Sequence, residues 1–415
     1  MKAPPPTLKQ YETMNGSNLL SAQWHPSITT IPEKEWNQMF DNRQMKSHAL
    51  FLSMKTSNLQ NATFWYLTIH RNNQIVAIVP CFTYGLQLDI LAPAIVKVLS
   101  RQIRQFFPKF LCVRIFGVGS LASTCLQHIG IEKTLPPDEQ KAVGLIISEQ
   151  ILLKSKELSH SLIFIKEVPH GELAELQNLL SKDFCFYDSL PNCYVPVYTE
   201  VAPYPCRLRE KERYRYRQLK KRFNEQFYWE LVQDFSSVLD NFEDLYLDTL
   251  HKSPNQFEVL NRKFFDALNE RFPQESFMLI ARNNVDNKCE AAGLLMEDKD
   301  ALIPLYIGIN YSNSSSTIKL LHSNAIIKAV EEAEKRGLFH AVLGQTSYYP
   351  KVLSGALVER LFLGFYAHNT LVQILIKTIF GRLFAPTRVL PNAYAKAYAP
   401  KIIKAYADKN YRIFN

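Results

Sequence analysis

The chain has 415 residues, 47% of them hydrophobic and 21% charged, which is enough apolar material to bury a large core and predicts two or three domains. This composition excludes an intrinsically disordered chain. Prolines and polar residues stand at the amino terminus where an export signal needs an apolar stretch, and no apolar run reaches the roughly 18 to 20 residues of a membrane-spanning helix. The sequence therefore predicts a cytoplasmic protein without a transmembrane segment.

The net charge of +9 is concentrated in two segments. Residues 206–227 contain nine Lys or Arg residues against three acidic residues, and residues 377–415 contain eight against one. The remainder of the chain is slightly acidic. Such clustering indicates an anionic partner at these two places.

The seven cysteines are an odd number, lie mostly in apolar runs, and form no C-x-x-C pair. We expect reduced core cysteines rather than a disulfide framework or zinc ligands, and we expect no metal.

The first half, to about residue 196, alternates strand-like and helix-like segments. FWYLTIHRNNQIVAIVPCFTY predicts a hairpin around a polar turn at residues 71–74. Apolar residues at helical spacing predict a helix within residues 91–110, and LCVRIFGVGS predicts a strand that ends in glycines. A further helix at 139–158 and a strand at 161–168 follow, so the pattern is mixed α/β.

A basic segment separates the two halves. Residues 206–227 contain no Gly or Pro, and an apolar stripe at three- and four-residue steps predicts a helix with most of its cations on the other faces.

The second half repeats the pattern of the first. Residues 233–252 and 256–272 predict two helices, the second capped by Ser253 or Asn255. Three strands are expected within residues 275–284, 289–298 and 300–310. A long helix at 316–337 stops at Gly337. Two further strands, AVLG at 341–344 and ERLFLGFY at 359–366, enclose a polar loop.

The serine-rich start of the long helix is the first candidate site. Ser314, Ser315, Ser316 and Thr317 lie where the first backbone N–H groups of a helix lack internal partners. Such an end binds phosphate through these donors and the helix dipole, which predicts a pyrophosphate site. The alternative is ordinary helix capping, for which Ser and Thr are preferred in any protein.

The polar loop between the last two strands is the second candidate site. Lys351 can anchor a phosphate or stabilise an oxyanion there. Four neighbouring side chains can orient a polar acceptor: Gln345, Thr346, Tyr348 and Tyr349. The alternative is a solvated surface lysine.

The order of these segments resembles a known family. The strand with G-x-I-N-Y, the Ser-rich loop, the helix that ends in AEKRG, the LGQTSYYPKVLSGA segment and the strand VERLFLGFY are similar to the carboxy-terminal domain of GNAT-fold acyltransferases related to the Fem peptidoglycan aminoacyl-transferases. The resemblance covers residues 64–366. It implies an α/β (α+β) fold of two tandem GNAT-like domains, each a mixed, mostly antiparallel sheet flanked by helices. It implies a degenerate GNAT-like domain at residues 1–199 and a basic linker helix at 200–227. The acyltransferase domain, with a basic tail, then comprises residues 228–415.

The resemblance also implies an N-acyltransferase, which moves an acyl or aminoacyl group from a thioester or ester donor to an amine by direct attack in a cleft between the two domains. Lys351 matches the family lysine near the reacting carbonyl, and Ser314 to Thr317 match the turn that holds the pyrophosphate of coenzyme A. The segment SNSSSTIK lacks the glycines of the Q/R-x-x-G-x-G/A phosphate loop. The donor is therefore left open between acyl-CoA, an acyl-carrier protein and aminoacyl-tRNA, and the acceptor between a small-molecule amine and a cell-envelope amine.

The base that takes the proton of the amine has two candidates, Glu290 and Tyr306, and the alternative for each is a structural role. His322 lies among apolar neighbours and is interpreted as a core histidine.

Two alternatives to the enzyme use the basic segments. Tyr214 and Tyr216 alternate with arginines in the 206–227 segment, as in nucleic-acid binding by phosphate contact and stacking. The segments LVQILIKTIFGRLF and AKAYAPKIIKAY form a basic amphipathic end that suits peripheral contact with an anionic membrane at the inner face.

Overall fold

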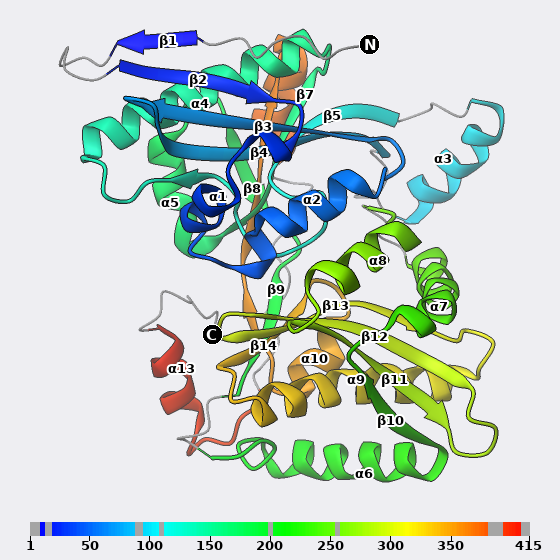
Figure 1. Ribbon diagram of the computed structural model, residues 1–415. Helices are drawn as coiled ribbons and strands as arrows, with labels where there is room; N and C mark the ends of the chain where they lie inside the picture. The colour runs from blue at the N-terminus through cyan, green and yellow to red at the C-terminus, as the bar shows by residue number, and fades with distance from the viewer. Residues whose placement is uncertain are drawn as a thin grey trace. The chain divides into compact units, whose positions relative to one another are not determined.

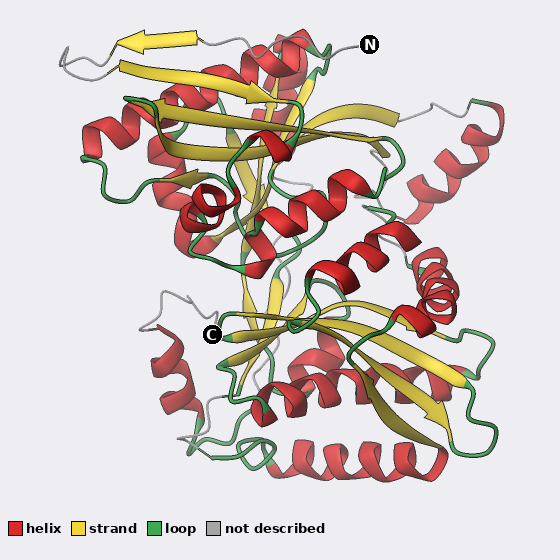
Figure 2. Cartoon of the chain, viewed as in Figure 1, coloured by secondary structure: helices red, strands yellow, loops and turns green. Residues whose placement is uncertain are grey.

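The computed structural model describes residues 9–12, 19–87, 94–107, 112–197, 202–253, 258–380 and 393–407. These residues form two mostly antiparallel sheets, each flanked by helices (Figure 1, Figure 2), which confirms the predicted mixed α/β class. The second basic segment of the sequence lies partly outside the described residues, at 381–392 and 408–415. Among the described helices, none has the length and apolar character that a membrane crossing requires.

The chain forms two compact units that each combine separate stretches. The first unit comprises residues 1–189, 254–260 and 362–385, and the second comprises 190–253, 261–361 and 386–415. Strand β9 (Asn192–Pro196) belongs to the sheet of the second unit, whereas β16 (Leu361–Ala367), near the other end of the chain, belongs to the sheet of the first. Position along the chain therefore does not by itself assign an element to a unit.

The sheet of the first unit has the strand order β1-β2-β3-β4-β5-β7-β16-β8, and β6 pairs with β4. Its other strands are β1 (Lys9–Glu12), β2 (Leu19–His25), β3 (Ala62–Arg71), β4 (Gln74–Gln87), β5 (Cys112–Val118), β6 (Gly130–Ile131), β7 (Leu162–Pro169) and β8 (Cys185–Asp188). Strands β3 and β4 are the predicted hairpin around residues 71–74.

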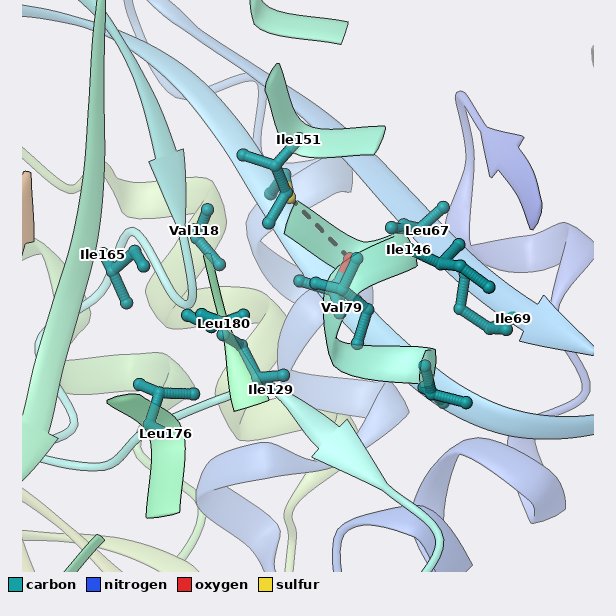
Figure 3. Packing of buried hydrophobic residues seen from close by; sticks show 14 of the residues in the cluster. Leu67, Ile69, Val79, Val118, Ile129, Ile146, Ile151, Ile165, Leu176 and Leu180 are labelled. Carbon is teal, nitrogen blue, oxygen red and sulfur yellow. Dashed lines mark hydrogen bonds between the residues drawn. The ribbon is translucent and has the colours of Figure 1, made fainter. Parts of the chain in front are cut away.

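Helices cover both faces of this first sheet. Successive side chains of a strand point to opposite faces, so Tyr66 and Leu67 of β3 face different helices. Leu67 joins an aliphatic core with Ile146 and Ile151 of one long helix (Figure 3), whereas the ring of Tyr66 contacts that of Trp36. The helices of this unit are α1 (Glu33–Met39), α2 (His48–Thr56), α3 (Ala94–Phe106), α4 (Pro137–Glu157), α5 (His170–Leu179) and α11 (Thr370–Leu375), with 3-10 turns at Ile28–Thr30 and Gln44–Lys46 and a π-helix at Ile376–Phe380.

The parallel strand pair of the first unit is tied together at its end. β5 and β7 pair in parallel at four successive positions, from Ile115 with Leu162 to Val118 with Ile165. Just beyond, the carboxylate of buried Glu167 accepts hydrogen bonds from the backbone N–H groups of Thr124 (2.9 Å) and Cys125 (2.8 Å). These bonds fasten the loop after β5 to the end of β7, so the two strands stay closed at this place.

The sheet of the second unit has the order β10-β11-β12-β13-β14-β9-β15, and every neighbouring pair is antiparallel except β13 with β14. Besides β9, its strands are β10 (Phe227–Val232), β11 (Ser276–Asn283), β12 (Cys289–Asp298), β13 (Ala301–Ile309), β14 (His340–Gly344) and β15 (Leu357–Glu359). The three strands predicted between residues 275 and 310 are thus present and consecutive.

Helices α7 and α8 lie on one face of this second sheet, and α9 with α6 lies on the other (Figure 1). The helices are α6 (Glu210–Gln226), α7 (Leu239–Lys252), α8 (Arg262–Arg271), α9 (Ser315–Lys335), α10 (Tyr348–Leu353) and α13 (Ala399–Ala407), with a 3-10 turn at Ser236–Val238. The basic helix α6 is held on α9 by Lys220, whose ammonium lies 2.6 Å from the carboxylate of Glu331. Gly308 of β13 admits α7 closely: a Cβ there would lie 2.6 Å from Cβ of Leu245.

Two details of the second unit differ from the sequence predictions. The helix predicted from residue 256 begins at Arg262, and Asn261 caps it by accepting a hydrogen bond from the backbone N–H of Phe264. The prediction of Ser253 or Asn255 as its cap was wrong for Ser253, which is the C-cap of α7; Asn255 lies outside the described residues. The predicted polar loop contains the short helix α10.

Candidate functional site

The parallel strands β13 and β14 of the second unit separate after a short pairing, unlike the parallel strands β5 and β7 of the first unit. Among the described residues, β13 and β14 pair at two positions, Ala301 with His340 and Leu302 with Ala341. β13 then continues to Ile309, and the register against β12 shifts near Leu305. β14 ends at Gly344, so both strands extend beyond their short pairing and diverge there. The backbone of β13 that has no partner in β14 borders an opening in the sheet.

A pocket of about 290 Å³ lies at this opening, wholly within the second unit. Its lining residues come from β10 to β14, from α7 on one face of the sheet, and from α9 and α10. They are Trp229, Tyr246, Thr249, Leu250, Ser253, Leu279, Ala291, Ala292, Gly293, Leu295, Pro304, Leu305, Tyr306, Ile307, His322, Ala325, Ile326, Ala329, Leu343, Gln345, Thr346, Ser347 and Lys351. Residues on both faces of the sheet thus line one pocket, as the divergence of β13 from β14 permits.

Alternation along the strands divides the pocket into two arms. The ring of Tyr306 packs against that of Tyr246 with centroids 5.8 Å apart, so this side of β13 faces α7. Leu279 and Leu295 share a core cluster with Ile326 of α9, so their side of the sheet faces α9. We name the two parts the α7 arm and the α9 arm.

Lys351 is a buried cation at this pocket. Its side chain is on α10, its exposed fraction is 6%, and its ammonium donates hydrogen bonds to the carbonyl oxygens of Gly344 (3.1 Å) and Gln345 (2.7 Å). A buried ammonium costs free energy unless such acceptors compensate it. The two bonds fix the charge at the end of β14, where it can attract a developing negative charge.

The turn before α10 has a strained backbone. Thr346 and Ser347 have φ angles of 64° and 49°, in the left-handed region that residues with a Cβ seldom adopt, whereas Gly344 with φ of 70° adopts it without strain. The carbonyl groups that Lys351 binds belong to this same turn. Because the ammonium of Lys351 binds two carbonyls of this turn, the lysine and the turn hold each other in position. Strained backbone that surrounding contacts hold in place is frequent at binding sites.

His322 of α9 is a pocket residue that the sequence reasoning interpreted as a core histidine. It shares its helix face with Ala325, Ile326 and Ala329, which also line the pocket. Burial, and then the nearby charge of Lys351, lower the pKa of His322 to about 4. The imidazole is therefore neutral at pH 7. The spacing of 322, 325, 326 and 329 was the signal that could have placed it here.

The lowered pKa of His322 predicts a pH-dependent loss of stability. The unfolded chain binds a proton at this residue below pH 6.5, and the folded chain does not until about pH 4. The stability is therefore complete above pH 6.5 and decreases as the pH falls from 6.5 toward 4, by about 2 kcal/mol at pH 5. We expect His322→Gln to lose about 2 kcal/mol less than the wild type between pH 7.5 and pH 5, measured by urea unfolding.

His25 and His128 also have lowered pKa values through burial, but their contribution is the same in both proteins and cancels in the comparison. An equal loss of stability in wild type and variant would contradict the assignment of His322.

Of the two predicted bases, Tyr306 lines the pocket and Glu290 does not. Glu290 is buried, and its carboxylate accepts hydrogen bonds from the side-chain amides of Asn310 (2.8 Å) and Asn313 (2.6 Å). These bonds hold the turn that leads from β13 into α9. Glu290 thus positions the start of α9.

The serine-rich start of α9 is exposed and is not among the pocket-lining residues. Ser314 is the N-cap and accepts a hydrogen bond from the backbone N–H of Thr317, and its hydroxyl also bonds the hydroxyls of Ser316 and Thr317. The capping that the sequence offered as an alternative is present. The binding of phosphate by the start of α9 stays a prediction.

The residues predicted to orient an acceptor divide into two pairs. Gln345 and Thr346 line the pocket, and the Gln345 side chain donates to the carbonyl of Leu190 (2.8 Å). Tyr348 packs against the core cluster that contains Leu343. Tyr349 is 66% exposed, under the guanidinium of Arg215 at 6.0 Å. The structure thus brings Lys351, Tyr306, Gln345 and Thr346 together at one pocket.

Cysteine chemistry and metal binding have no support at this site. Burial raises the pKa of the Cys193 thiol to about 11 even though Lys351 lowers it, so this thiol stays protonated at pH 7. Six cysteines of the described chain are free thiols. In the described ranges no group of three His, Cys, Asp or Glu side chains could hold a metal ion.

Comparison with known proteins identifies the family. Residues 27–341 match the FemAB-like family, which is described as acting in peptidoglycan biosynthesis/recognition. The chain belongs to the FemAB-like family. A comparison with proteins of curated function found no match to this chain.

Several solved structures resemble this chain at low sequence identity. FemX matches with a TM-score of 0.50 at 10% identity, over 84% of this chain and 99% of FemX. L-PGS from Bacillus licheniformis has a TM-score of 0.49 at 10% identity, over 87% of this chain and 98% of that chain. A tandem GNAT protein from the clavulanic acid biosynthesis pathway has a TM-score of 0.44 at 6% identity, over 84% and 99%. The predicted resemblance to Fem-related proteins and the predicted fold class of two mixed, mostly antiparallel sheets flanked by helices are confirmed.

Proposed function

We propose that this FemAB-like protein is a transferase that moves an acyl or aminoacyl group from a thioester or ester donor to an amine. One observation carries the proposal: the buried ammonium of Lys351, fixed by two backbone carbonyls, lines the pocket where β13 and β14 diverge. A fixed cation in a site with few water molecules stabilises a negative charge that develops on a carbonyl oxygen.

The reaction forms one bond and breaks another. The amine nitrogen attacks the acyl carbonyl carbon, and the carbonyl electrons move to oxygen, where Lys351 stabilises them. When the carbonyl re-forms, the C–S or C–O bond to the donor breaks and the leaving atom keeps the electron pair. The proton lost by nitrogen ends on that atom, so the products are an amide and a free thiol or hydroxyl.

The proton has two carriers among the pocket-lining residues. A neutral imidazole has one nitrogen that accepts a proton and one N–H that donates, so His322 can pass the proton from the amine to the leaving atom. The Tyr306 hydroxyl can do the same. Both accompany Lys351 in one pocket, which supports direct transfer to the amine without an enzyme-bound intermediate.

The donor and the acceptor follow from the earlier predictions and the family. Ser314, Ser315, Ser316 and Thr317 at the start of α9 are proposed to hold the phosphates of acyl-CoA, of a carrier protein or of aminoacyl-tRNA. Gln345 and Thr346, which line the pocket, are proposed to orient the acceptor. The family description supports an amine of a peptidoglycan peptide as this acceptor.

The test offers each donor class with a peptidoglycan peptide that carries a free amine. Mass spectrometry of the products should show a new amide with at least one donor, and loss of that product in a Lys351→Met variant. A protein that forms no amide with any donor, while folded and pure, contradicts the proposal.

The basic helix α6 supports a second, binding function. Lys211, Arg217, Lys221 and Arg222 are exposed, and Tyr214 between them is 59% exposed. Exposed cations with an exposed aromatic ring suit an RNA-borne donor, whose phosphates and bases they would contact.

Replacement of Lys211, Arg217 and Lys221 by alanine should weaken the binding of tRNA. Each lost phosphate contact on a single strand lowers the slope of log K against log salt by about 0.7, so three contacts lower it by roughly 2. Fluorescence anisotropy at several salt concentrations measures this slope. The matched control replaces three exposed lysines elsewhere in this unit, Lys252, Lys288 and Lys299. Equal slopes in the two triple variants would contradict RNA binding by α6.

Peripheral membrane contact stays a prediction. Leu371, Val372, Ile374 and Leu375 of α11 are exposed, as an apolar face that enters a lipid surface would be. The continuation of this segment, residues 381–392, lies outside the described residues.

A further inference from the structure

The floor of the α9 arm is a row of residues that crosses four strands. Ile307 of β13 lies opposite Gly293 of β12, and Gly293 lies opposite Leu279 of β11. Leu279 in turn lies opposite Leu231 of β10, and the residue of β10 that lines the pocket is Trp229, two positions before Leu231. Strands are about 4.8 Å apart, so the row from β13 to β10 spans about 14 Å. The arm therefore leads from the opening beside β14 across the sheet under α9.

Apart from His322 of α9, the walls of this arm are apolar. Leu279, Leu295, Ile326 and Ala329 are buried in one cluster around it, and Trp229 lies at its far end. The polar lining residues Lys351, Gln345 and Thr346 come instead from α10 and from the turn between β14 and α10, on the side of the opening. A ligand that fills both places has one polar end and one apolar end.

Gly293 is the residue in this row without a side chain, and packing does not require a glycine there. A Cβ at Gly293 would lie 3.7 Å from Cδ1 of Leu295 and 3.9 Å from the carbonyl oxygen of Tyr306, which are ordinary contacts. Glycine in the interior of a strand weakens it and is frequent where a ligand approaches the backbone closely. Gly308 in the adjacent strand differs, since a Cβ there would strike the backbone of α7.

We propose that the α9 arm binds the apolar chain of the donor acyl group, and that Gly293 keeps the middle of the arm open for a chain of medium length. The polar head, with its carbonyl, then lies by Lys351, and the chain crosses β13 to β10. The whole pocket, both arms included, has a volume of about 290 Å³ and holds on the order of ten carbon-sized atoms, since one water occupies about 30 Å³ of liquid, so this is the upper limit for the bound acyl group. This proposal rests on the proposed transferase function and names its donor class.

The test measures binding and transfer separately. Straight-chain carboxylates of four, six and eight carbons serve as binding probes, because their carboxylate can pair with Lys351 while the chain enters the arm. Calorimetry on the full chain should show about a fourfold gain in affinity for each added methylene, the fold-change that corresponds to ~0.8 kcal/mol of buried CH₂. Transfer is then followed with acyl thioesters of the same lengths.

Gly293→Val is the decisive variant. Its side chain should occupy the middle of the arm, weaken octanoate binding at least tenfold, and leave butanoate binding within twofold of the wild type. Gly85→Val is the matched control, because Gly85 also lies in a strand, in the first unit, and the atom nearest to a Cβ there is Cβ of Asn61 at 4.0 Å. We expect this control to bind all three probes as the wild type does.

The outcomes separate the two proposals. In one outcome, carboxylate binding depends on chain length, Gly293→Val removes this dependence, and the protein transfers no acyl group. This outcome supports the apolar arm and refutes the transferase. Transfer with equal rates for four-carbon and eight-carbon donors, and equal binding of butanoate and octanoate, overturns the apolar arm and leaves the transferase. A loss of octanoate binding in both valine variants also overturns the assignment of Gly293.

Discussion

Replacement of Lys351 by methionine is expected to lower kcat/KM for acyl transfer by about 10² to 10³, the loss seen when one donor to an oxyanion is removed. Methionine has nearly the length of lysine and no charge, so it fills the same buried space beside Gly344 and Gln345 without the ammonium. The rate is measured with the donor that gives the most amide in the product assay. Donor binding should change less than the rate, because the charge on oxygen develops only in the transition state.

A structural role for Lys351 predicts a different result. Loss of its two hydrogen bonds leaves the carbonyls of the strained turn without these donors, at a cost of about 1 to 3 kcal/mol in the free energy of unfolding. The unfolding midpoint is therefore measured with the rate, and the exposed Lys335→Met serves as the matched control. A folded Lys351→Met protein with a rate within twofold of the wild type would remove the lysine from the mechanism.

Gly308→Val is expected to be the most damaging single substitution in the sheet of the second unit. A Cβ at Gly308 would lie 2.7 Å from the backbone carbonyl carbon of Leu245 and from the backbone nitrogen of Tyr246, so α7 must move. Overpacking of this kind typically costs about 1 to 3 kcal/mol, and the two further carbons of valine raise the cost toward or beyond the upper value. The displaced helix also carries Tyr246 and Thr249, which line the α7 arm.

Urea unfolding and the binding of the carboxylate probes test this expectation together. Gly293→Val is the natural comparison, because Gly293 lies in the adjacent strand and has room for a Cβ. The expected pattern is a large loss of stability for Gly308→Val and little loss for Gly293→Val. Similar stabilities for the two variants would show that α7 tolerates a shift and that the close approach at Gly308 is not required.

Elements with a strong local signal could be predicted from the sequence. The helix predicted at 316–337 is α9, because its apolar period and the glycine at 337, with φ of 70°, both act within the segment itself. The strands β11 to β13 follow from β-rich runs separated by polar turns. Lys351 stood out for the same reason, since a lysine among polar residues between two apolar runs is visible in the chain.

The remainder of the site depends on pairings that are distant in sequence. Nothing near residues 192–196 indicates that this strand inserts between β14 and β15, more than a hundred residues later. The divergence of β13 from β14, which creates the pocket, is a property of two strands and of no single segment. The spacing of His322 to residues 325, 326 and 329 shows that they share one helix face, but the sequence does not show that this face borders the pocket that Lys351 also lines.

The exchange of β9 and β16 has a consequence for any attempt to divide the protein. A break near residue 200 yields an amino-terminal fragment that carries β9, which the second sheet needs, and a carboxy-terminal fragment that carries β16, which the first sheet needs. The amino-terminal fragment alone would lack β16 in its sheet and would carry β9 without the neighbours of this strand. The carboxy-terminal fragment alone would lack β9 in its sheet and would carry β16 without the neighbours of that strand. The two fragments should therefore be insoluble when produced separately and should reassemble when produced in the same cell, and a chain nicked there should stay in one piece.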